Sequence, residues 1–162
     1  MKRLIFTMIV ICACQMSFAQ NTDAIYNEFK DVKGVESVSV SPFLMKFARL
    51  FMDSEDKNNP LIKGTHSVKV LDLEDCTKDI KKQFTQRVNQ LQHNGYETWL
   101  QAKKDGENVK IIAKKEDQVI NELLVLTTGN DDCALVLIKG KIRQENIQAI
   151  IDDDKIMIDG RK

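Results

Sequence analysis

The chain has little of what most catalytic sites are built from. It contains two histidines, two prolines and seven glycines among 162 residues. No glycine-rich phosphate loop and no Gly-x-Ser-x-Gly elbow occurs in it. We expect the histidines, His66 and His93, at the solvated surface, because no convergent set of metal-ligand residues accompanies them. The sequence therefore predicts no catalytic, cofactor-binding or metal-binding residues, and we expect a protein that is not an enzyme.

Neither sign of charge dominates the sequence. It has 24 basic and 24 acidic side chains, whereas a surface that binds nucleic acid usually carries a clear basic excess. Removal of the first 19 residues would take Lys2 and Arg3 away and leave a slight acidic excess. No nucleic-acid partner is expected.

The chain also offers no apolar run near its start that could span a membrane. The run at residues 4–13 follows a basic head at residues 1–3. It is shorter than the roughly 20 apolar residues of a transmembrane helix, but it has the length and flanks of a secretory signal. The small-x-small pattern at residues 17–19 predicts cleavage between Ala19 and Gln20.

A lipoprotein signal is the alternative to simple cleavage. Residues 11–14 (ICAC) loosely fit a lipobox that would place an acyl chain on Cys14. Simple cleavage is favoured because Cys12 fits the middle position of a lipobox poorly. Only an acylated Cys14 would attach the protein to a membrane. With either signal we expect export to the periplasm or outer membrane surface of a Gram-negative bacterium, or secretion.

Residues 20–162 have the length of a single domain, since a chain of this size builds one hydrophobic core. They keep two of the four cysteines, Cys76 and Cys133, in a compartment that tolerates disulfides. A disulfide between them and a pair of small, buried, apolar side chains are equally favoured. Cys76 is also close to the start of a predicted helix, where the pKa of a thiol can be lowered.

Apolar periodicity predicts that helices and strands alternate in the first part of this domain. The first elements are expected to be a helix that Thr22 caps and that stops at Gly34, a strand at 35–41, and a helix at 43–52 that the Ser41 cap and Pro42 start. A loop at 53–66, a strand at 67–73 and a helix that Asp75 or Thr77 caps and that stops at 94–95 are predicted to follow.

The second part of the domain is predicted to be a meander of four strands followed by a last helix. The strands are expected at residues 96–103, 109–114, 119–126 and 133–138, and the helix around Ile147, Ile150 and Ile151. The last two strands carry apolar residues on both faces, which is typical of central strands covered on both sides. The fold class is therefore α+β, with a mostly antiparallel sheet, a C-terminal four-strand meander and helices packed against it.

The helix at residues 43–52 carries more apolar residues than one buried stripe needs. Phe43, Phe47 and Phe51 share a face, but apolar side chains also lie outside it. Burial on two sides is favoured, and a contact surface is the alternative. Trp99, on the polar face of its predicted strand, is a further candidate contact residue.

Three sequence features together resemble a known family. They are the signal end Phe18-Ala19-Gln20, the strand-to-helix step at residues 38–42 (VSVSP), and the segment at residues 136–142 (VLIKGKI) that leads into the last helix. The chain resembles, over most of residues 20–162, the domain-of-unknown-function 4252 family of exported Bacteroidetes proteins, often labelled secreted proteins or lipoproteins. The resemblance implies a noncatalytic cell-envelope protein, and no catalytic residues carry over.

The leading hypothesis is a noncatalytic binding or interaction module that binds an envelope protein or another surface partner. It depends on the export signal, the apolar helix at residues 43–52 and the missing catalytic set. The alternatives are an exported thiol protein that uses Cys76, and a small-ligand carrier with an apolar pocket between sheet and helices.

Overall fold

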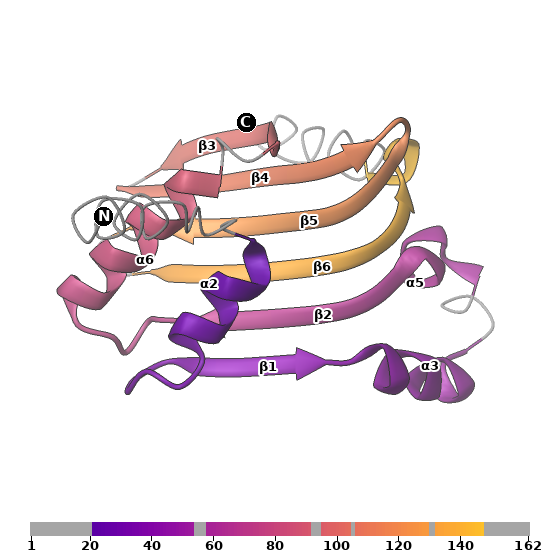
Figure 1. Cartoon of the computed structure of the whole chain (residues 1–162), viewed down its shortest axis with the longest axis horizontal. Coiled ribbons are helices and arrows are strands. Elements are labelled where there is room, and N and C mark those ends of the chain that lie inside the picture. Colours follow the sequence, from indigo (N-terminus) through magenta and orange to yellow (C-terminus); the bar gives the residue numbers. More distant parts are fainter. Residues whose placement is uncertain (1–20, 54–57, 92–94, 105, 130–131, 148–162) are drawn as a thin grey trace, which may run out of the picture.

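A computed structural model describes residues 21–53, 58–91, 95–104, 106–129 and 132–147 of the chain. The predicted signal segment, its cleavage site, Cys14 and the last helix beyond Ile147 lie outside these residues. The elements are α2 (Thr22–Phe29), β1 (Glu36–Val40), α3 (Pro42–Phe51), α5 (Pro60–Gly64), β2 (Thr65–Asp72), α6 (Lys78–Gln90), β3 (Glu97–Lys104), β4 (Glu107–Glu116), β5 (Val119–Thr128) and β6 (Cys133–Arg143) (Figure 1).

The six strands form one sheet in the order β1-β2-β6-β5-β4-β3, and every neighbouring pair is antiparallel. Strands β3 to β6 are consecutive in both sequence and space, so the predicted four-strand meander is confirmed. The hairpin of β1 and β2 adds to the edge of this meander at β6. The predicted α+β class with a mostly antiparallel sheet is also confirmed.

The N-cap of helix α2 (Thr22–Phe29) lies one residue earlier than the cap predicted from the sequence. The side chain of Asn21, not that of Thr22, caps the helix by accepting a hydrogen bond of 2.7 Å from the backbone N–H of Ala24. The chain then turns at Gly34, whose φ of +90° lies in the left-handed region that favours glycine. A Cβ at this position would lie 2.9 Å from the carbonyl oxygen of Asp75, which leaves no space for a side chain.

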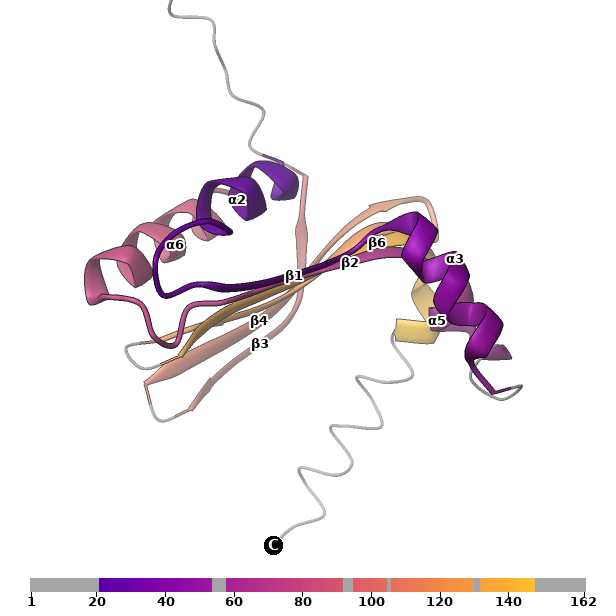
Figure 2. The ribbon, with the colours of Figure 1, turned by 90° about the horizontal axis from the view of Figure 1, so that it is seen from below.

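Helices α2 and α6 cover the same face of the sheet (Figure 2). The rings of Phe29 and Phe84 meet edge to face, with centroids 5.4 Å apart. Below them lies the main core. The apolar side chains of both helices form it together with the side chains on the facing side of the sheet. Its largest members with no solvent exposure are Phe84, Leu71, Leu73, Leu91, Leu124 and Leu135.

Helices α3 and α5 lie at the other end of the sheet (Figure 2). Ser41 and Pro42 start α3 as predicted. Arg49 ties this helix to its neighbours by donating hydrogen bonds to the carbonyl oxygens of Ile62, at 2.6 Å, and of Thr65. The prediction of a loop at residues 53–66 was wrong for α5, which Asn59 caps by accepting from the N–H of Leu61.

The main core gives a direct test of the fold. Leu124 lies in the central strand β5 with no solvent exposure, whereas Val38 in the edge strand β1 is 56% exposed. Leu124→Ala should lower the free energy of unfolding by about 2–5 kcal/mol, because it removes buried methyl groups and leaves a cavity. The control Val38→Ala should cost about 1 kcal/mol or less. Urea denaturation measures both, and equal losses would contradict this assignment of the core.

Candidate interaction surface

One row of apolar side chains crosses all six strands on the face of the sheet opposite α2 and α6. Successive residues of a strand point to opposite faces, and the strand register sets each member of the row directly beside the next. In strand order, the row consists of Val38, Val70, Val136, Val125, Ile111 and Leu100. We call this surface the open face.

The open face is packed at one end, where Ile111 and Leu100 of the row also contact the packed side chains. There a second, smaller core forms around Leu123 and Ile142, and Leu61 of α5 and Ile147 of the helical turn at residues 144–147 pack against it. The middle of the face has no such cover. Figure 2 shows that no helix of the described residues lies over it. Val38 is the most exposed member of the row, and the other five are half-buried.

The uncovered row corrects one prediction about the central strands. Apolar residues on both faces of β5 and β6 predicted cover on both sides. Leu124 and Leu135 are indeed sealed beneath the helices, but Val125 and Val136 on the other face keep partial exposure. The sequence pattern shows that apolar residues form this face of the strands. It does not reveal which element, if any, covers the face.

Acidic side chains border the open face at its β1–β2 corner. Glu36 and Asp72 are exposed and lie directly opposite each other in the register, an arrangement of like charges that destabilises a sheet. Together with Glu74, Asp75 and Gly34 they line a cavity of about 80 Å³. The open face therefore has a negatively charged end.

Helix α3 presents apolar side chains to solvent. The favoured prediction of burial on two sides was wrong for the side chains that the structure describes, since Phe43 is 75% and Leu50 70% exposed. The helix sits at the end of the sheet and contacts β2, so only part of its surface faces protein. The side chains of Phe47 and Phe51 lie outside the described part of the structure.

Trp99 is not on a polar face, so its predicted placement was wrong. The register of β3 against β4 shifts between Thr98 and Leu100, and this bulge lets two successive residues contact the same face. Trp99 and Leu100 both pack against the smaller core. Because β3 and β1 are opposite edges of the sheet, Trp99 and the exposed Phe43 of α3 do not form one patch.

The two cysteines are free thiols in the main core. Cys133 and Cys76 are both buried, and their Sγ atoms donate weak hydrogen bonds to the carbonyl oxygens of Gly129 and Lys33, respectively. The disulfide alternative is therefore wrong, and the alternative of small buried side chains is confirmed. Burial raises the pKa of the Cys76 thiol, which is the reverse of what a reactive thiolate needs.

A polar cluster joins the start of α2 to the sheet. Asp23 accepts hydrogen bonds from Lys139 at 2.5 Å and from Lys69 at 2.8 Å. Lys69 also lies 4.9 Å from the ring centre of Tyr26. Burial by itself would raise the pKa of the Asp23 carboxyl, but the two lysines outweigh it and hold this pKa below its ordinary value.

Glu122 of β5 completes this cluster. It accepts hydrogen bonds from the hydroxyls of Thr22, at 2.5 Å, and Tyr96, at 2.8 Å, and pairs with Lys139 at 3.4 Å. Burial, together with Glu122, raises the pKa of the Tyr96 hydroxyl. Since each carboxylate has a protein partner, the cluster fixes α2 on the sheet and is not arranged as an open site.

Neither a cluster of metal ligands nor a membrane-spanning helix occurs within the described residues. Within them, no three His, Cys, Asp or Glu side chains are grouped to hold a metal ion. None of the helices in this part of the chain has the length and apolarity to cross a bilayer. His66 is exposed as expected, and His93 lies outside the described residues.

Comparison with known proteins identifies a family and nothing more specific. The family model named Domain of unknown function (DUF4252) matches residues 26–150. No curated protein and no solved structure matches the chain. The match covers the sheet, the open face and the four helices of the described residues except the first turn of α2.

The buried thiols are expected to react slowly with a thiol reagent. In the chain without residues 1–19, DTNB should react slowly with the folded protein at pH 7, because Cys76 and Cys133 are buried and the pKa of Cys76 is raised. After unfolding in guanidinium without reductant, both thiols should react. A fast-reacting thiol in the folded protein, or no free thiol after unfolding, would contradict the structure.

The polar cluster predicts a pH-dependent contribution to stability. The lowered pKa of Asp23 in the folded state means that folding favours its ionised form. This contribution is present above the unfolded pKa of about 4 and is lost as the pH falls through the folded value. Asp23→Asn should therefore lower the free energy of unfolding at pH 7 by about 1 kcal/mol or less, since the carboxylate is partly exposed.

Chemical denaturation at pH 7 and at pH 3 measures this difference. The gap between the natural chain and Asp23→Asn should shrink at pH 3. The exposed Asp31, whose side chain is 86% exposed, supplies the control Asp31→Asn, which should change little at either pH. A gap for Asp23→Asn that grows toward low pH would contradict the proposed ionic contacts.

Proposed function

The chain belongs to the DUF4252 family, whose function is unknown, and from its own surface we propose that it is a noncatalytic, exported binding module of the cell envelope. Its partner is an apolar helix of another protein, with basic residues at one end, and this helix lies on the open face. The observation that carries the proposal is the six-residue apolar row, which no helix of the described residues covers.

A helix is the expected occupant because helices already cover the same sheet from the other side. Figure 1 shows α2 running across the strands, and its side chains Ile25 and Phe29 are buried against the core. Six strands spaced about 4.8 Å apart give a row of about 24 Å. A helix rising 1.5 Å per residue would need about 16 residues to follow that row, an ordinary length.

Charge specifies one end of the partner. Glu36 and Asp72 repel each other at the β1–β2 corner, and a Lys or Arg of a bound helix would relieve that repulsion. Electrostatic complementarity of this kind contributes more to orientation and specificity than to affinity. The partner helix is therefore expected to lie with its basic end at this corner.

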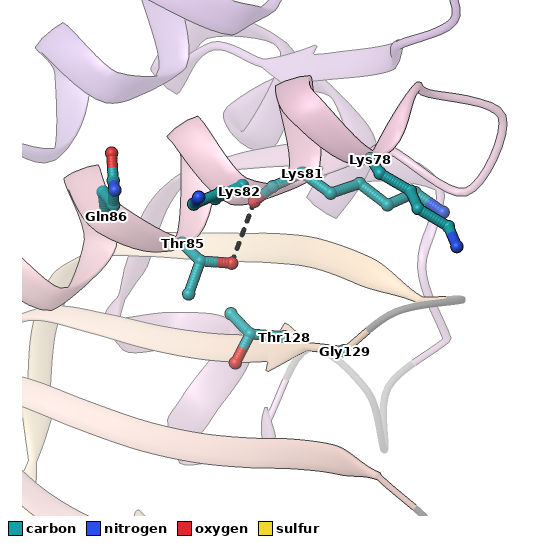
Figure 3. A pocket seen from close by; sticks show the side chains of 7 residues that line it. All are labelled: Lys78, Lys81, Lys82, Thr85, Gln86, Thr128 and Gly129. Carbon is teal, nitrogen blue, oxygen red and sulfur yellow. Dashed lines mark hydrogen bonds between the residues drawn. The ribbon is translucent and has the colours of Figure 1, made fainter.

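The alternatives receive less support from the same residues. A thiol protein would need an accessible Cys76 with a lowered thiol pKa, but this thiol is buried and its pKa is raised. A carrier of apolar ligands would need an apolar cavity between sheet and helices. The cavity that adjoins α6 is lined mainly by lysine, threonine and glutamine side chains instead (Figure 3).

Neighbouring residues of β1 provide a matched pair of variants. Val38 is exposed on the open face, and Ser39 is exposed on the opposite face of the same strand. Proteins would be crosslinked to the chain in the envelope fraction of its host and identified. The binding of a true partner should weaken by about tenfold or more with Val38→Glu, which buries a charge in the interface, and stay unchanged with Ser39→Glu.

A second variant tests the charge at the corner. Asp72→Lys should weaken the binding of the same partner and reduce the dependence of its affinity on salt.

Three outcomes would contradict the proposal of a partner helix. The first is a captured protein that binds the Val38→Glu and Ser39→Glu variants equally well. Self-association that Val38→Glu abolishes would assign the open face to a second copy. If a chain that ends at Ile147 binds more of an apolar dye than the full chain does, the open face would be assigned to the chain's own residues 148–162. Either of these two outcomes would also overturn the proposal that a helix of another protein lies on the open face.

A further inference from the structure

A second surface, separate from the open face, is the outer side of helix α3. Four large apolar side chains of the described residues are exposed, and one of them is Val38 of the open face. The other three all belong to α3: Phe43 is 75%, Leu44 48% and Leu50 70% exposed. Exposed apolar side chains that lie together mark a contact site, whereas scattered ones need no explanation. We call these three residues the α3 patch.

The helical period places the α3 patch on one side of the helix. At 3.6 residues per turn, its three side chains span an arc of about 120°. The half-buried side chains Met45, Ala48 and Arg49 lie outside this arc, on the side that faces the protein. The more apolar side of α3 therefore faces solvent.

Arg49 holds the helix in this orientation. Its guanidinium donates hydrogen bonds to the carbonyl oxygens of Ile62, at 2.6 Å, and of Thr65. Ile62 belongs to α5 and Thr65 begins β2, which α3 also contacts. A rotation of α3 that buried the patch would break these charge-assisted hydrogen bonds. The exposure of the patch is therefore built into the fold.

The position of α3 favours a deformable partner. Figure 2 shows that the helix projects beyond the strands at one end of the sheet, away from α2 and α6. A projecting helix presents a convex surface, for which a protein partner would need a matching groove. The headgroup layer of a lipid bilayer is fluid and takes in protruding aromatic and aliphatic side chains without one.

Basic side chains border the α3 patch on one side. Lys46 is exposed and lies three residues after Phe43 and four before Leu50, so it is a neighbour of both on the helix surface. Lys63 is exposed on the adjacent α5, where it donates a hydrogen bond of 3.1 Å to the neutral side chain of Asn58. Lysines at the edge of an apolar patch extend their ammonium groups to lipid phosphates while their stems stay with the apolar layer.

Acidic residues follow the helix. Asp53 is exposed, and residues 54–57 (SEDK), which lie outside the described residues, add two acidic side chains and a lysine. Over residues 42–66 the sequence has four basic and three acidic side chains. Because this balance is nearly even, the apolar side chains and not the lysines must supply most of the binding free energy.

We propose that α3 is an interfacial helix that inserts Phe43, Leu44 and Leu50 into the headgroup layer of a lipid bilayer, with Lys46 and Lys63 at the lipid phosphates. The contact is peripheral and needs no acyl chain on Cys14, so it adds a route to the membrane that the sequence pattern did not indicate. It also goes beyond the proposed partner helix, because α3 contributes no residue to the open face.

Co-sedimentation with lipid vesicles tests the interfacial helix. The chain without residues 1–19 is used, because the apolar run at residues 4–13 would itself bind lipid. Vesicles of phosphatidylethanolamine mixed with phosphatidylglycerol should bind this chain in a saturable way. Phe43→Ser/Leu50→Ser should lower the partition coefficient by about tenfold or more, because two apolar side chains leave the interface. Lys46→Gln should lower it by about fivefold, and less at high salt.

Val38→Ser is the matched control, since it removes an exposed apolar side chain from the open face and should leave vesicle binding unchanged. Urea denaturation checks that each variant is folded. The proposal would be overturned by a chain that does not bind the vesicles, or by equal binding of Phe43→Ser/Leu50→Ser and Val38→Ser. Self-association without lipid that Phe43→Ser/Leu50→Ser abolishes would assign the patch to a second copy instead. The partner helix is tested with Val38→Glu, which leaves α3 unchanged, so the two proposals can fail separately.

Discussion

The pairing of β5 with β6 is the constraint on which the rest of the structure depends. These neighbouring strands carry apolar side chains on both faces, with Leu124 and Leu135 on one side and Val125 and Val136 on the other. A sheet with two apolar faces needs cover on both to keep them from water. Helices α2 and α6 seal one face, and the described residues leave the middle of the other uncovered.

The placement of α2 shows how the sealed face is held. Its apolar stripe contributes to the main core, and at its first turn Asp23 and Thr22 are linked to Lys139 and Glu122 of the central strands. Partly buried ionic contacts contribute modestly to stability, but they specify which end of the helix meets which strands. The polar cluster therefore acts on orientation, while the apolar stripe supplies most of the free energy of burial.

The features on which the proposed function depends lie on the surface of the described residues. The open face combines an apolar row with an acidic corner at Glu36 and Asp72, a pairing of properties that suits a protein partner with an apolar, basic-ended helix. Among the described residues, the cavity beside α6 is lined by three lysines together with threonine, glutamine and glycine. The cysteines, in contrast, belong to the core as buried thiols. Membership of the DUF4252 family agrees with the resemblance found in the sequence and adds no ligand to it.

The sequence by itself determined the order and type of most elements, because each depends on local signals: apolar periodicity in α2 and α6, the Ser41-Pro42 start of α3, the glycine after α2 and the alternation in the meander. It could not locate α5, a single short turn of helix with too few residues to show a period, or the bulge that turns Trp99 onto the apolar face. Only the tertiary structure decided that Val38 and Leu100 belong to one row, that Cys76 and Cys133 stay unbridged, and that Phe43 and Leu50 of α3 stay exposed. These features depend on which strands become neighbours and where helices pack, and long-range pairing of this kind leaves no local pattern in the chain.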